Sequence, residues 1–564
     1  MTTDKKSIAL LVDFFVKKGF RHIVISPGSR NAPVILAFTQ HPGIEALSVV
    51  DERSAAFFAL GIARQTGKTV ALSCTSGTAT LNYAPAIAEA YYQKVPLLIL
   101  TADRPPEMID QGDGQTIRQK NIYANYIKKS FELPETCSSD EELTHAQHII
   151  NEAIHHTLAP DFGPVHINLP FTEPLYGQAE DYAFKDIYKP SASWGEVPAI
   201  SDLKIKSLAS QWNLADKKML VAGMMNPDVR LGVLLKRITD DPSIVLLTET
   251  TSNLQNNCSC PCIDRVVSSV LPEESESYRP ELLVTFGGPV VSKMLKTFLR
   301  KNKPSAHWNI DPVDYQMNTY QCLTEGIPST PQRFFESILP HIEKRASDYL
   351  EQWRSRDERS ERRHQEFLTN TGHSDLKVFE VILNEMPDNS IVHLGNSTPV
   401  RYAQLFRTLQ PLTFYANRGT SGIDGAVSTA AGSAWASQQP TIVITGDLGF
   451  LYDSNALMNH YLKGNFRIIV INNSGGGIFR FIPGPAQTQQ LETYFEANHA
   501  WKTEFIARNF SVPYAHACNQ QDLVDILPDF FKPRIDGKPA ILEIMTPNKK
   551  NAEILKAYFH FLKV

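Results

Sequence analysis

The stretch TIVITGDLGFLYDSNAL, residues 441–457, is followed by FRIIVINNSGGGIF, residues 466–479. Each stretch opens with a short β-branched run and then changes to turn residues, which is typical of strands that end in loops. The interval between Asp447 and Asn473 is long enough for one crossover helix. We therefore expect both residues at the carboxyl edge of one parallel sheet, where open α/β sheets bind their ligands.

The side chains at this edge have a common chemistry. A carboxylate from Asp447, an amide oxygen from Asn473 and a backbone carbonyl from Gly475 are hard oxygen ligands that suit an octahedral Mg²⁺. A magnesium ion with so few protein ligands completes its shell with phosphate oxygens and water. Gly475 and Gly476 let backbone N–H groups approach such phosphates closely. Either dipeptide alone could be ordinary turn chemistry, but together they predict a metal-assisted diphosphate site.

Outward from this edge, short β-branched runs alternate with helical patterns along the whole chain, which indicates an α/β protein. We expect three doubly wound parallel-sheet domains at 1–184, 203–345 and 376–564, joined by a linker at 185–202 and a charged, solvated connector helix at 346–375. The predicted strands are 22–26, 69–74, 96–102 and 164–170; then 219–225, 243–250, 281–288 and 305–310; then 390–396, 412–419, 441–447, 466–473 and 539–546.

Composition excludes several classes of protein. The 564 residues are 42% hydrophobic and 20% charged, which is a globular and not a disordered composition. The net charge is −5 and there is no long basic run, so nucleic acid is not an expected partner. No apolar stretch approaches the roughly 20 residues that cross a bilayer, and the first 20 residues form an amphipathic helical pattern unlike a signal peptide.

The cysteines point to a reducing compartment. Seven cysteines are too few for a disulfide framework and their number is odd, so we expect a cytoplasmic protein. Cys258, Cys260 and Cys262 resemble half of a metal clip, but no second Cys or His pair stands at zinc-like spacing. Buried or idle thiols are therefore the favoured interpretation.

A carboxylate in the first third of the chain is the second candidate site. In VVDERSAAF, residues 49–57, Asp51 can cap a helix that starts near Ser54, which leaves Glu52 at the helix entrance and beside a strand edge. A first-turn glutamate often does no more than complement the helix dipole, worth roughly 0.3–1 kcal/mol. The residue becomes a catalytic candidate only because a diphosphate site is predicted downstream.

The Gly-Asp and Asn-Asn-Ser-Gly pair resembles the diphosphate-binding motif of thiamine diphosphate enzymes, although Leu448 stands where that superfamily usually has a further glycine. Several more segments narrow the resemblance. ISPGSRNAP, DERSAAF, TADRPPE, GQTIRQ, GNSTPVR and NRGTSGIDG, in this order, closely resemble the 2-succinyl-5-enolpyruvyl-6-hydroxy-3-cyclohexene-1-carboxylate synthases of menaquinone biosynthesis. The resemblance covers both outer domains and, more loosely, the middle one.

The resemblance implies pyrimidine-binding, central and diphosphate-binding domains, with thiamine diphosphate and Mg²⁺, or Mn²⁺, as cofactors. It implies decarboxylation of 2-oxoglutarate and 1,4-addition of the succinyl unit to isochorismate. Glu52 would be the catalytic carboxylate and would hydrogen-bond the aminopyrimidine of the cofactor. The other cofactor-binding positions implied are Pro27, Thr78, Ser397, Ile423, Asp447, Asn473, Gly475 and Gly476, of which Asp447, Asn473 and Gly475 would bind the metal.

Two dicarboxylate substrates require fixed cations, and bidentate guanidinium groups suit carboxylates. The substrate-binding positions implied are Ser29, Arg30, Arg104, Gln115, Lys293, Arg401, Arg418, Ile478 and Phe479. Met294 follows Lys293 where some relatives carry a second basic residue. Because Glu52 and Asp447 belong to different domains, the family pattern implies active sites at a subunit interface. A homodimer would be the minimum catalytic unit, and the resemblance leads us to expect a dimer of dimers.

Three alternatives remain open from the sequence. An acetolactate synthase-like carboligase would share the cofactor site, but it would not need the arginines, and no long glycine-rich nucleotide signature is present in 203–330. A non-catalytic anion-binding homologue would keep the fold without releasing CO₂ from 2-oxoglutarate. A nicotinamide-dependent oxidoreductase is disfavoured because GGGIF lacks G-x-G-x-x-G spacing.

Overall fold

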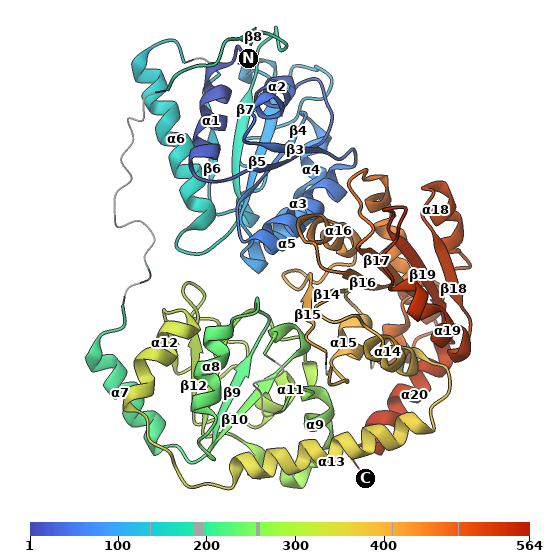
Figure 1. The fold of residues 1–564 in the computed structure, drawn as a ribbon. Helices are drawn as coiled ribbons and strands as arrows, with labels where there is room; N and C mark the ends of the chain where they lie inside the picture. Colours follow the sequence, from blue (N-terminus) through green and yellow to red (C-terminus); the bar gives the residue numbers. More distant parts are fainter. Residues whose placement is uncertain are drawn as a thin grey trace.

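The computed structural model describes residues 1–135, 137–184, 197, 199–254, 260–408, 410–482 and 484–563. The chain forms three parallel sheets, each covered by helices (Figure 1). The prediction of an α/β protein with three doubly wound domains is confirmed. The sheets lie inside the three predicted domain ranges, whereas most of the predicted linker lies outside the described residues.

The amino-terminal sheet has six parallel strands in the order β3-β2-β4-β5-β7-β6. Its strands are β2 (His22–Ile25), β3 (Glu45–Ser48), β4 (Val70–Cys74), β5 (Leu97–Asp103), β6 (Ser130–Glu132) and β7 (Val165–Pro170). Its helices are α1 (Lys6–Lys17), α2 (Ala32–Gln40), α3 (Glu52–Thr66), α4 (Thr78–Asn82), α5 (Ala84–Gln93) and α6 (Asp140–Leu158). A small antiparallel pair, β1 (Thr2–Thr3) and β8 (Gln178–Ala179), lies beside it.

The central sheet has five parallel strands in the order β10-β9-β11-β12-β13. Its strands are β9 (Lys218–Ala222), β10 (Ile244–Thr248), β11 (Leu282–Phe286), β12 (Ala306–Ile310) and β13 (Glu325–Ile327). Its helices are α7 (Asp202–Leu214), α8 (Val229–Ile238), α9 (Ile263–Ser269), α10 (Ser275–Tyr278), α11 (Lys293–Lys301) and α12 (Pro331–Ile338).

The carboxy-terminal sheet has six parallel strands in the order β15-β14-β16-β17-β19-β18. Its strands are β14 (Ile391–Leu394), β15 (Thr413–Ala416), β16 (Thr441–Gly446), β17 (Phe466–Asn472), β18 (Tyr514–Ala517) and β19 (Ala540–Met545). Its helices are α14 (Asp375–Asn384), α15 (Pro399–Ala403), α16 (Ala426–Ala436), α17 (Asp447–Tyr452), α18 (Thr503–Asn509), α19 (Gln520–Phe530) and α20 (Asn548–Phe561).

All three sheets place the second strand of the domain outside the first, and the third strand on the other side of the first. The strand order therefore reverses between β2 and β4, between β9 and β11, and between β14 and β16. Ligands of open parallel sheets bind outside the carboxyl ends of the strands at such a reversal. The fold thus singles out one edge position in each domain before any side chain is considered.

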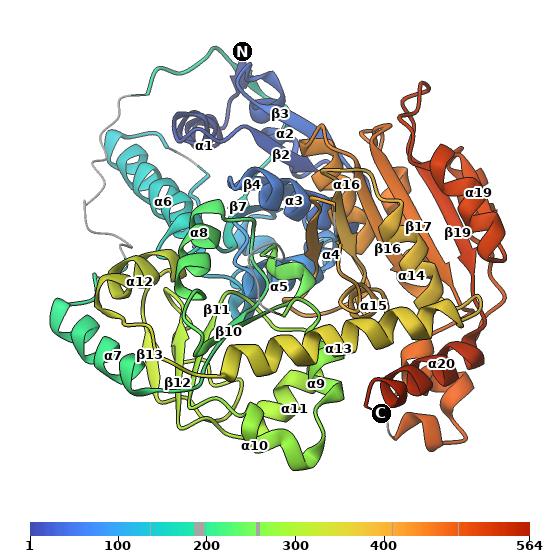
Figure 2. The same cartoon turned by 60° about the horizontal axis from the view of Figure 1, so that its bottom comes forward.

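The charged segment predicted as a connector forms the helix α13 (Tyr349–Thr369), which runs from the central domain to the carboxy-terminal domain (Figure 2). The helix is confirmed, but the expectation that it is solvated is wrong along one face. Trp353 is fully buried in the core of the central domain, and His364 is buried where its Nδ1 lies 2.7 Å from the Tyr558 hydroxyl of α20. Trp353 therefore attaches this helix to the central domain, and His364 attaches it to the carboxy-terminal domain.

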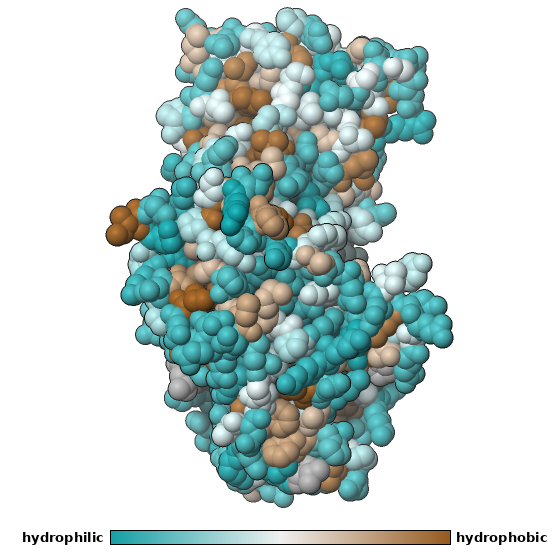
Figure 3. Space-filling view, turned by 90° about the vertical axis from the view of Figure 1, so that its right-hand side faces the viewer, coloured by the Kyte–Doolittle hydropathy of each residue, from teal (hydrophilic) through white to brown (hydrophobic). Residues whose placement is uncertain are grey.

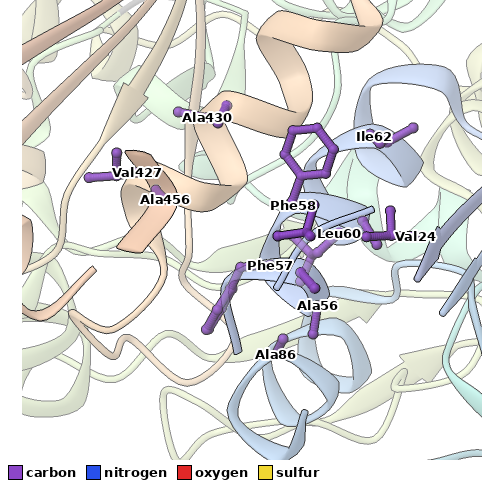
Figure 4. Close-up of a cluster of buried hydrophobic side chains, with 14 of the residues drawn as sticks. Val24, Ala56, Phe57, Phe58, Leu60, Ile62, Ala86, Val427, Ala430 and Ala456 are labelled. Atoms are coloured by element: carbon purple, nitrogen blue, oxygen red, sulfur yellow. The ribbon is translucent and has the colours of Figure 1, made fainter. Parts of the chain in front are cut away.

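The amino-terminal and carboxy-terminal domains of one chain share a core, in which α3 crosses α16 (Figure 4). Phe57 and Phe58 of α3 belong to the same buried cluster as Val427 and Ala430 of α16. The two backbones approach closely, because a Cβ on Gly61 would lie 2.0 Å from the Thr429 carbonyl oxygen. This crossing holds the two outer domains together within the chain.

Figure 3 shows the side of the molecule on which α18 and α19 lie, where small apolar patches are separated by hydrophilic surface. Among the described residues, no helix is both long and apolar enough to cross a membrane. Cys260 and Cys262 are buried thiols that form no disulfide among the described residues, and Cys258 lies outside the described residues.

Candidate active site

The carboxyl edge of the carboxy-terminal sheet brings Asp447 and Asn473 together. Asp447 is the first residue of α17, directly after β16, and Asn473 directly follows β17. The two strands are parallel neighbours, with Gly446 opposite Ile471, so their carboxyl ends meet at one edge. The expected placement of both residues is confirmed. Ser397 follows β14 across the strand-order reversal, and its φ of 76° turns the chain sharply there.

The Asp447 carboxylate is buried and oriented by its surroundings. Its Oδ1 accepts a hydrogen bond of 2.7 Å from the Leu448 N–H, and its Oδ2 accepts one of 2.8 Å from the Gly475 N–H. His499 Nε2 lies 3.2 Å from the same Oδ2. Gly475 has a φ of +147°, and a Cβ there would lie 2.6 Å from the Glu496 carbonyl oxygen. Only glycine fits this turn, which follows Asn473 and hydrogen-bonds to Asp447, so the three predicted metal ligands lie close together.

Asn473 supplies an unused acceptor at the same place. Its Oδ1 is buried and has no hydrogen-bond partner among the described residues. A buried polar atom without a partner costs about 1–3 kcal/mol, so this oxygen is well placed to bind a cation or a hydrogen-bond donor. The described residues contain no group of three or more His, Cys, Asp or Glu side chains able to hold a metal. One carboxylate and one amide oxygen therefore fit a hard cation shared with phosphate better than a protein-only metal cage.

Asp375, at the start of α14, lies behind Asn473 and was not anticipated from the sequence. It accepts hydrogen bonds from Thr546 Oγ1 at 2.6 Å and Asn551 Nδ2 at 2.9 Å. Burial raises the pKa of Asp375 to about 6; its hydrogen bonds oppose the shift, and the Asp447 charge adds to it. The proposed ligands thus rest on a buried polar network.

Two cavities open beside this edge. One, of about 770 Å³, is lined largely by apolar side chains that include Ile423, Leu448 and Trp501. Ile423 is 37% exposed, which is unusual for isoleucine and leaves it free to contact a ligand. The other, of about 160 Å³, is lined by Lys293, Arg401, Ile478, Asp264, Met294, Thr398, Tyr402, Leu405, Phe481, Ile482, Leu555 and Phe559. The smaller cavity therefore brings together three of the predicted substrate-binding residues.

Two arginines form a positively charged pair at this side. Arg401 donates to the Ser397 carbonyl oxygen, and Arg418 Nη1 donates to Asn396 Oδ1 at 2.8 Å. Burial lowers the pKa of both guanidinium groups, and the charge of Arg401 lowers that of Arg418 further. The Nε of Arg418 is buried and has no partner in the described chain. Two desolvated cations side by side favour an anionic ligand.

Phe479 does not line either cavity. Its ring centroid lies 5.8 Å from that of Phe495, and its ring lies next to Gly476, so it packs over the glycine turn. Phe481, which lines the smaller cavity, was not anticipated. Gly477–Arg480 form a 3-10 turn, which has three residues per turn. Adjacent side chains such as Ile478 and Phe479 therefore point in different directions.

The amino-terminal domain carries the other predicted residues at its own strand-order reversal. Asp51 caps α3 by accepting a hydrogen bond of 2.9 Å from the Ser54 N–H, as expected, and Glu52 is the first residue of the helix. The Glu52 carboxylate accepts a long hydrogen bond of 3.4 Å from Asn82 Nδ2. Pro27, after β2, and Thr78, at the start of α4, are exposed beside it.

The remaining predicted residues of this domain lie at the ends of β2 and β5. Arg30 is buried and donates to the Phe171 carbonyl oxygen and to Glu173, both at 3.1 Å. Its pKa is lowered, first by burial and then by the charge of Arg104. The side chains of Ser29 and Gln115 are exposed, and the Gln115 carbonyl oxygen accepts a hydrogen bond of 2.8 Å from Ser76 Oγ. Arg30 and Arg104 therefore form a second, smaller group of cations.

The two sets of residues do not meet within one chain. Among the described residues, no hydrogen bond or ion pair joins the amino-terminal set to the carboxy-terminal set. Both cavities are lined only by residues of the central and carboxy-terminal domains. The predicted residues of the described chain therefore form two groups, which we call the amino-terminal and the carboxy-terminal half-site.

Sequence reasoning missed His499, Asp375, Asp264 and Lys296. None stands inside a recognisable motif, and each reaches the site through the fold from a separate element or loop. A buried aspartate or histidine can be recognised only once its burial is known.

Comparisons with known proteins agree with this geometry. Residues 6–122 match the model of the thiamine pyrophosphate enzyme N-terminal TPP binding domain, and residues 395–544 match that of the C-terminal TPP binding domain. The two matched ranges contain Glu52 and Asp447, respectively. The protein thus carries both halves of a thiamine diphosphate site, one in each outer domain.

Full-length relatives share one name. The 2-succinyl-5-enolpyruvyl-6-hydroxy-3-cyclohexene-1-carboxylate synthase of Christiangramia forsetii is 43% identical over 98% of each chain. The synthase of Porphyromonas gingivalis is 41% identical over 99% of this chain and 98% of its own, and that of Desulfotalea psychrophila is 39% identical over 97% and 99%. At this identity and coverage, the chain belongs to the family of 2-succinyl-5-enolpyruvyl-6-hydroxy-3-cyclohexene-1-carboxylate synthases.

Proposed function

We propose that this protein, with thiamine diphosphate and Mg²⁺ or Mn²⁺, decarboxylates 2-oxoglutarate and adds the resulting succinyl unit to the conjugated alkene of isochorismate. The observation that supports this substrate choice best is the cluster of Lys293, Arg401 and Arg418 beside the proposed metal ligands. A donor and an acceptor that both carry two carboxylates require such fixed cations. An acetolactate-type reaction, whose donor and acceptor each carry one carboxylate, would need fewer of them.

The residues of the carboxy-terminal half-site would hold the diphosphate end of the cofactor. Asp447, Asn473 and the Gly475 carbonyl oxygen would bind the metal, and Ser397 and Gly476 would contact the cofactor. Ile423 would contact the cofactor with its exposed side chain. The buried hydrogen bonds to Asp447 keep its oxygens in place without a ligand.

The amino-terminal half-site would hold the pyrimidine end. The cofactor, when bound, would supply the nucleophile and the electron sink that decarboxylation of a 2-oxoacid requires. Glu52 would donate or accept one hydrogen bond at the pyrimidine ring, and Pro27 and Thr78 would border it. Its long, readily broken bond to Asn82 leaves the carboxylate available for this role.

Substrate carboxylates would lie between the two half-sites. Lys293, Arg401 and Arg418 would contribute from one side, and Ser29, Arg30, Arg104 and Gln115 from the other. Ile478 would form an apolar wall beside the acceptor ring, with Phe479 supporting the glycine turn behind it. Closure of these surfaces excludes water, whose protons would quench a carbanion.

A homo-oligomer follows from the incomplete half-sites. We place each active site between the amino-terminal domain of one chain and the carboxy-terminal domain of another, in a dimer or in a dimer of dimers. The exposed apolar residues around the larger cavity would be covered in this assembly. The free thiols fit a cytoplasmic enzyme.

The direct test is an assay of purified protein with thiamine diphosphate and Mg²⁺. We expect the coupled product only when 2-oxoglutarate and isochorismate are supplied together. With 2-oxoglutarate alone, we expect slow CO₂ release and no coupled product. Pyruvate is the matched donor control because it lacks the second carboxylate. Turnover of pyruvate at a rate equal to that of 2-oxoglutarate would contradict the proposal and favour an acetolactate-type enzyme.

A further inference from the structure

The first turn of α11 is fixed by two buried carboxylates. Glu249 follows β10, and its two oxygens accept hydrogen bonds of 2.7 Å from the Val291 N–H and 2.6 Å from the Ser292 N–H. Ser292 caps α11 by accepting from the Leu295 N–H at 2.9 Å, and its hydroxyl donates to Asp264. Lys293, the first residue of the helix, is thereby positioned at the wall of the smaller cavity.

Lys296 lies one turn further along the same helix. Residues three positions apart are neighbours on a helix surface, so Lys296 and Lys293 share one face of α11. The side chain of Lys296 is only partly exposed. Its pKa is lowered, mainly by burial and further by the charges of Arg418, Arg300 and Lys293, while Glu249 opposes the shift. The ammonium group thus lies among other cations and is partly removed from water.

No described residue forms a hydrogen bond or an ion pair with the Lys296 ammonium group. The two nearby carboxylates are already engaged: Glu249 with two backbone N–H groups, and Asp264 with Ser292. Lys293, Lys296, Arg401 and Arg418 therefore outnumber the local carboxylates. Such an excess of partly desolvated positive charge is unfavourable unless an anion binds there.

We propose that Lys296 binds a carboxylate of one of the two substrates and is a specificity-determining residue of this enzyme. Lys296 adds a second positive charge beside Lys293 in the first half of α11. Met294, which lines the cavity, carries no charge. This inference rests on the proposed function. The shared chemistry is a carboxylate, and the kinetics of each substrate in turn distinguish the donor from the acceptor.

The test compares Lys296→Met with Lys296→Arg and with the control Lys301→Met, which removes an exposed lysine from the last turn of the same helix. We expect Lys296→Met to raise the KM for one substrate by about tenfold to a hundredfold, with kcat changed much less, because one charge-assisted hydrogen bond is lost. Lys296→Arg should restore most of that loss. Lys301→Met should match the wild-type protein.

Each outcome decides a different question. If the wild-type protein does not turn over 2-oxoglutarate with isochorismate, the proposed function fails and this inference falls with it. If the wild-type protein is active and Lys296→Met keeps both KM values, the inference alone is wrong. A loss of thermal stability that Lys296→Met and Lys296→Arg share, without a selective change in KM, would also overturn it, because that pattern indicates packing.

Discussion

Glu52 lies in the first turn of α3, where a glutamate often only complements the helix dipole. A catalytic role for Glu52 must therefore be distinguished from a role in stabilising the helix. Asp51 already caps α3, and Glu52 makes only a long hydrogen bond to Asn82. We expect Glu52→Gln to fold normally and to bind cofactor, while kcat falls by about 100-fold or more because the pyrimidine ring loses a carboxylate partner. Steady-state kinetics and cofactor titration measure both quantities.

The matched control for this variant is Glu141→Gln. Glu141 also lies in the first turn of a helix, α6, and is exposed on the surface of the same domain. Its substitution should leave kcat unchanged. Near-normal activity of Glu52→Gln would remove Glu52 from the proposed mechanism.

The single residues of the site differ in how far the sequence could reveal them. Asp447, Asn473 and Glu52 stand at strand and helix ends with turn chemistry around them, so their edge positions could be predicted. His499 follows Asn473 by a long polar segment and contacts Asp447 only because the glycine turn folds back on residues 496–499. Contacts of this kind depend on tertiary packing, and no local pattern encodes them.

At the level of elements, Glu249 connects β10 to the first turn of α11. Burial raises the pKa of Glu249 from its ordinary value of 4.5 to about 7, and the hydrogen bonds from Val291 and Ser292 oppose this shift. The folded protein therefore binds the proton more tightly than the unfolded chain does. The contribution of Glu249 to the free energy of unfolding is full below pH 4.5 and is lost as pH rises to about 7.

We expect Glu249→Gln to abolish this part of the pH dependence. The difference in the free energy of unfolding between wild-type and variant protein should change by about 3 kcal/mol between pH 4.5 and a pH of about 7. Chemical unfolding at a series of pH values measures it, with the exposed Glu273→Gln as control. Parallel stability curves for wild-type protein and Glu249→Gln would show that Glu249 does not titrate in this range.

The crossing of α3 and α16 tolerates almost no added volume. A Cβ on Gly432 would lie 2.0 Å from the Phe58 carbonyl oxygen, which mirrors the approach of Gly61 to Thr429. We expect Gly61→Ala to lower stability by about 1–3 kcal/mol, as overpacking of a core does, and to lower activity by shifting the helix that starts at Glu52. Thermal unfolding and kinetics measure these effects.

Gly372→Ala is the control for that substitution, since a Cβ there meets nothing within 4 Å. It adds the same methyl group without the clash. Equal unfolding midpoints for Gly61→Ala and Gly372→Ala would show that the crossing is looser than the structure indicates.

The strands show why some elements could be predicted and others could not. The thirteen runs predicted as strands are all strands, because these strands are largely buried and read as continuous apolar runs. The short edge strands β3, β6, β13 and β18 were missed, since each is partly exposed and has no such run. Because α13 is rich in charged residues, its sequence did not indicate that one face of the helix is buried. On that face, Asp357 forms an ion pair with Arg407.

In the whole molecule, contacts between domains fix the two half-sites of one chain relative to each other. The Glu89 carboxylate accepts hydrogen bonds of 2.7 Å from the N–H groups of both Gly419 and Thr420. Asn455 donates to Asp51 at 2.6 Å, and Lys94 lies 2.9 Å from Asp311 of the central domain. Because these contacts hold the domains of one chain in place, the proposed function relies on a second chain to complete each site.

Mixing two inactive variants tests this arrangement most directly. Glu52→Gln and Asp447→Ala each damage a different half-site, so each homodimer should have little activity. If every site combines Glu52 of one chain with Asp447 of another, co-expressed chains form heterodimers in which one of the two sites carries no substitution. A statistical mixture should then recover about one quarter of wild-type activity. Activity no greater than that of the two variants measured separately would contradict a shared site between chains.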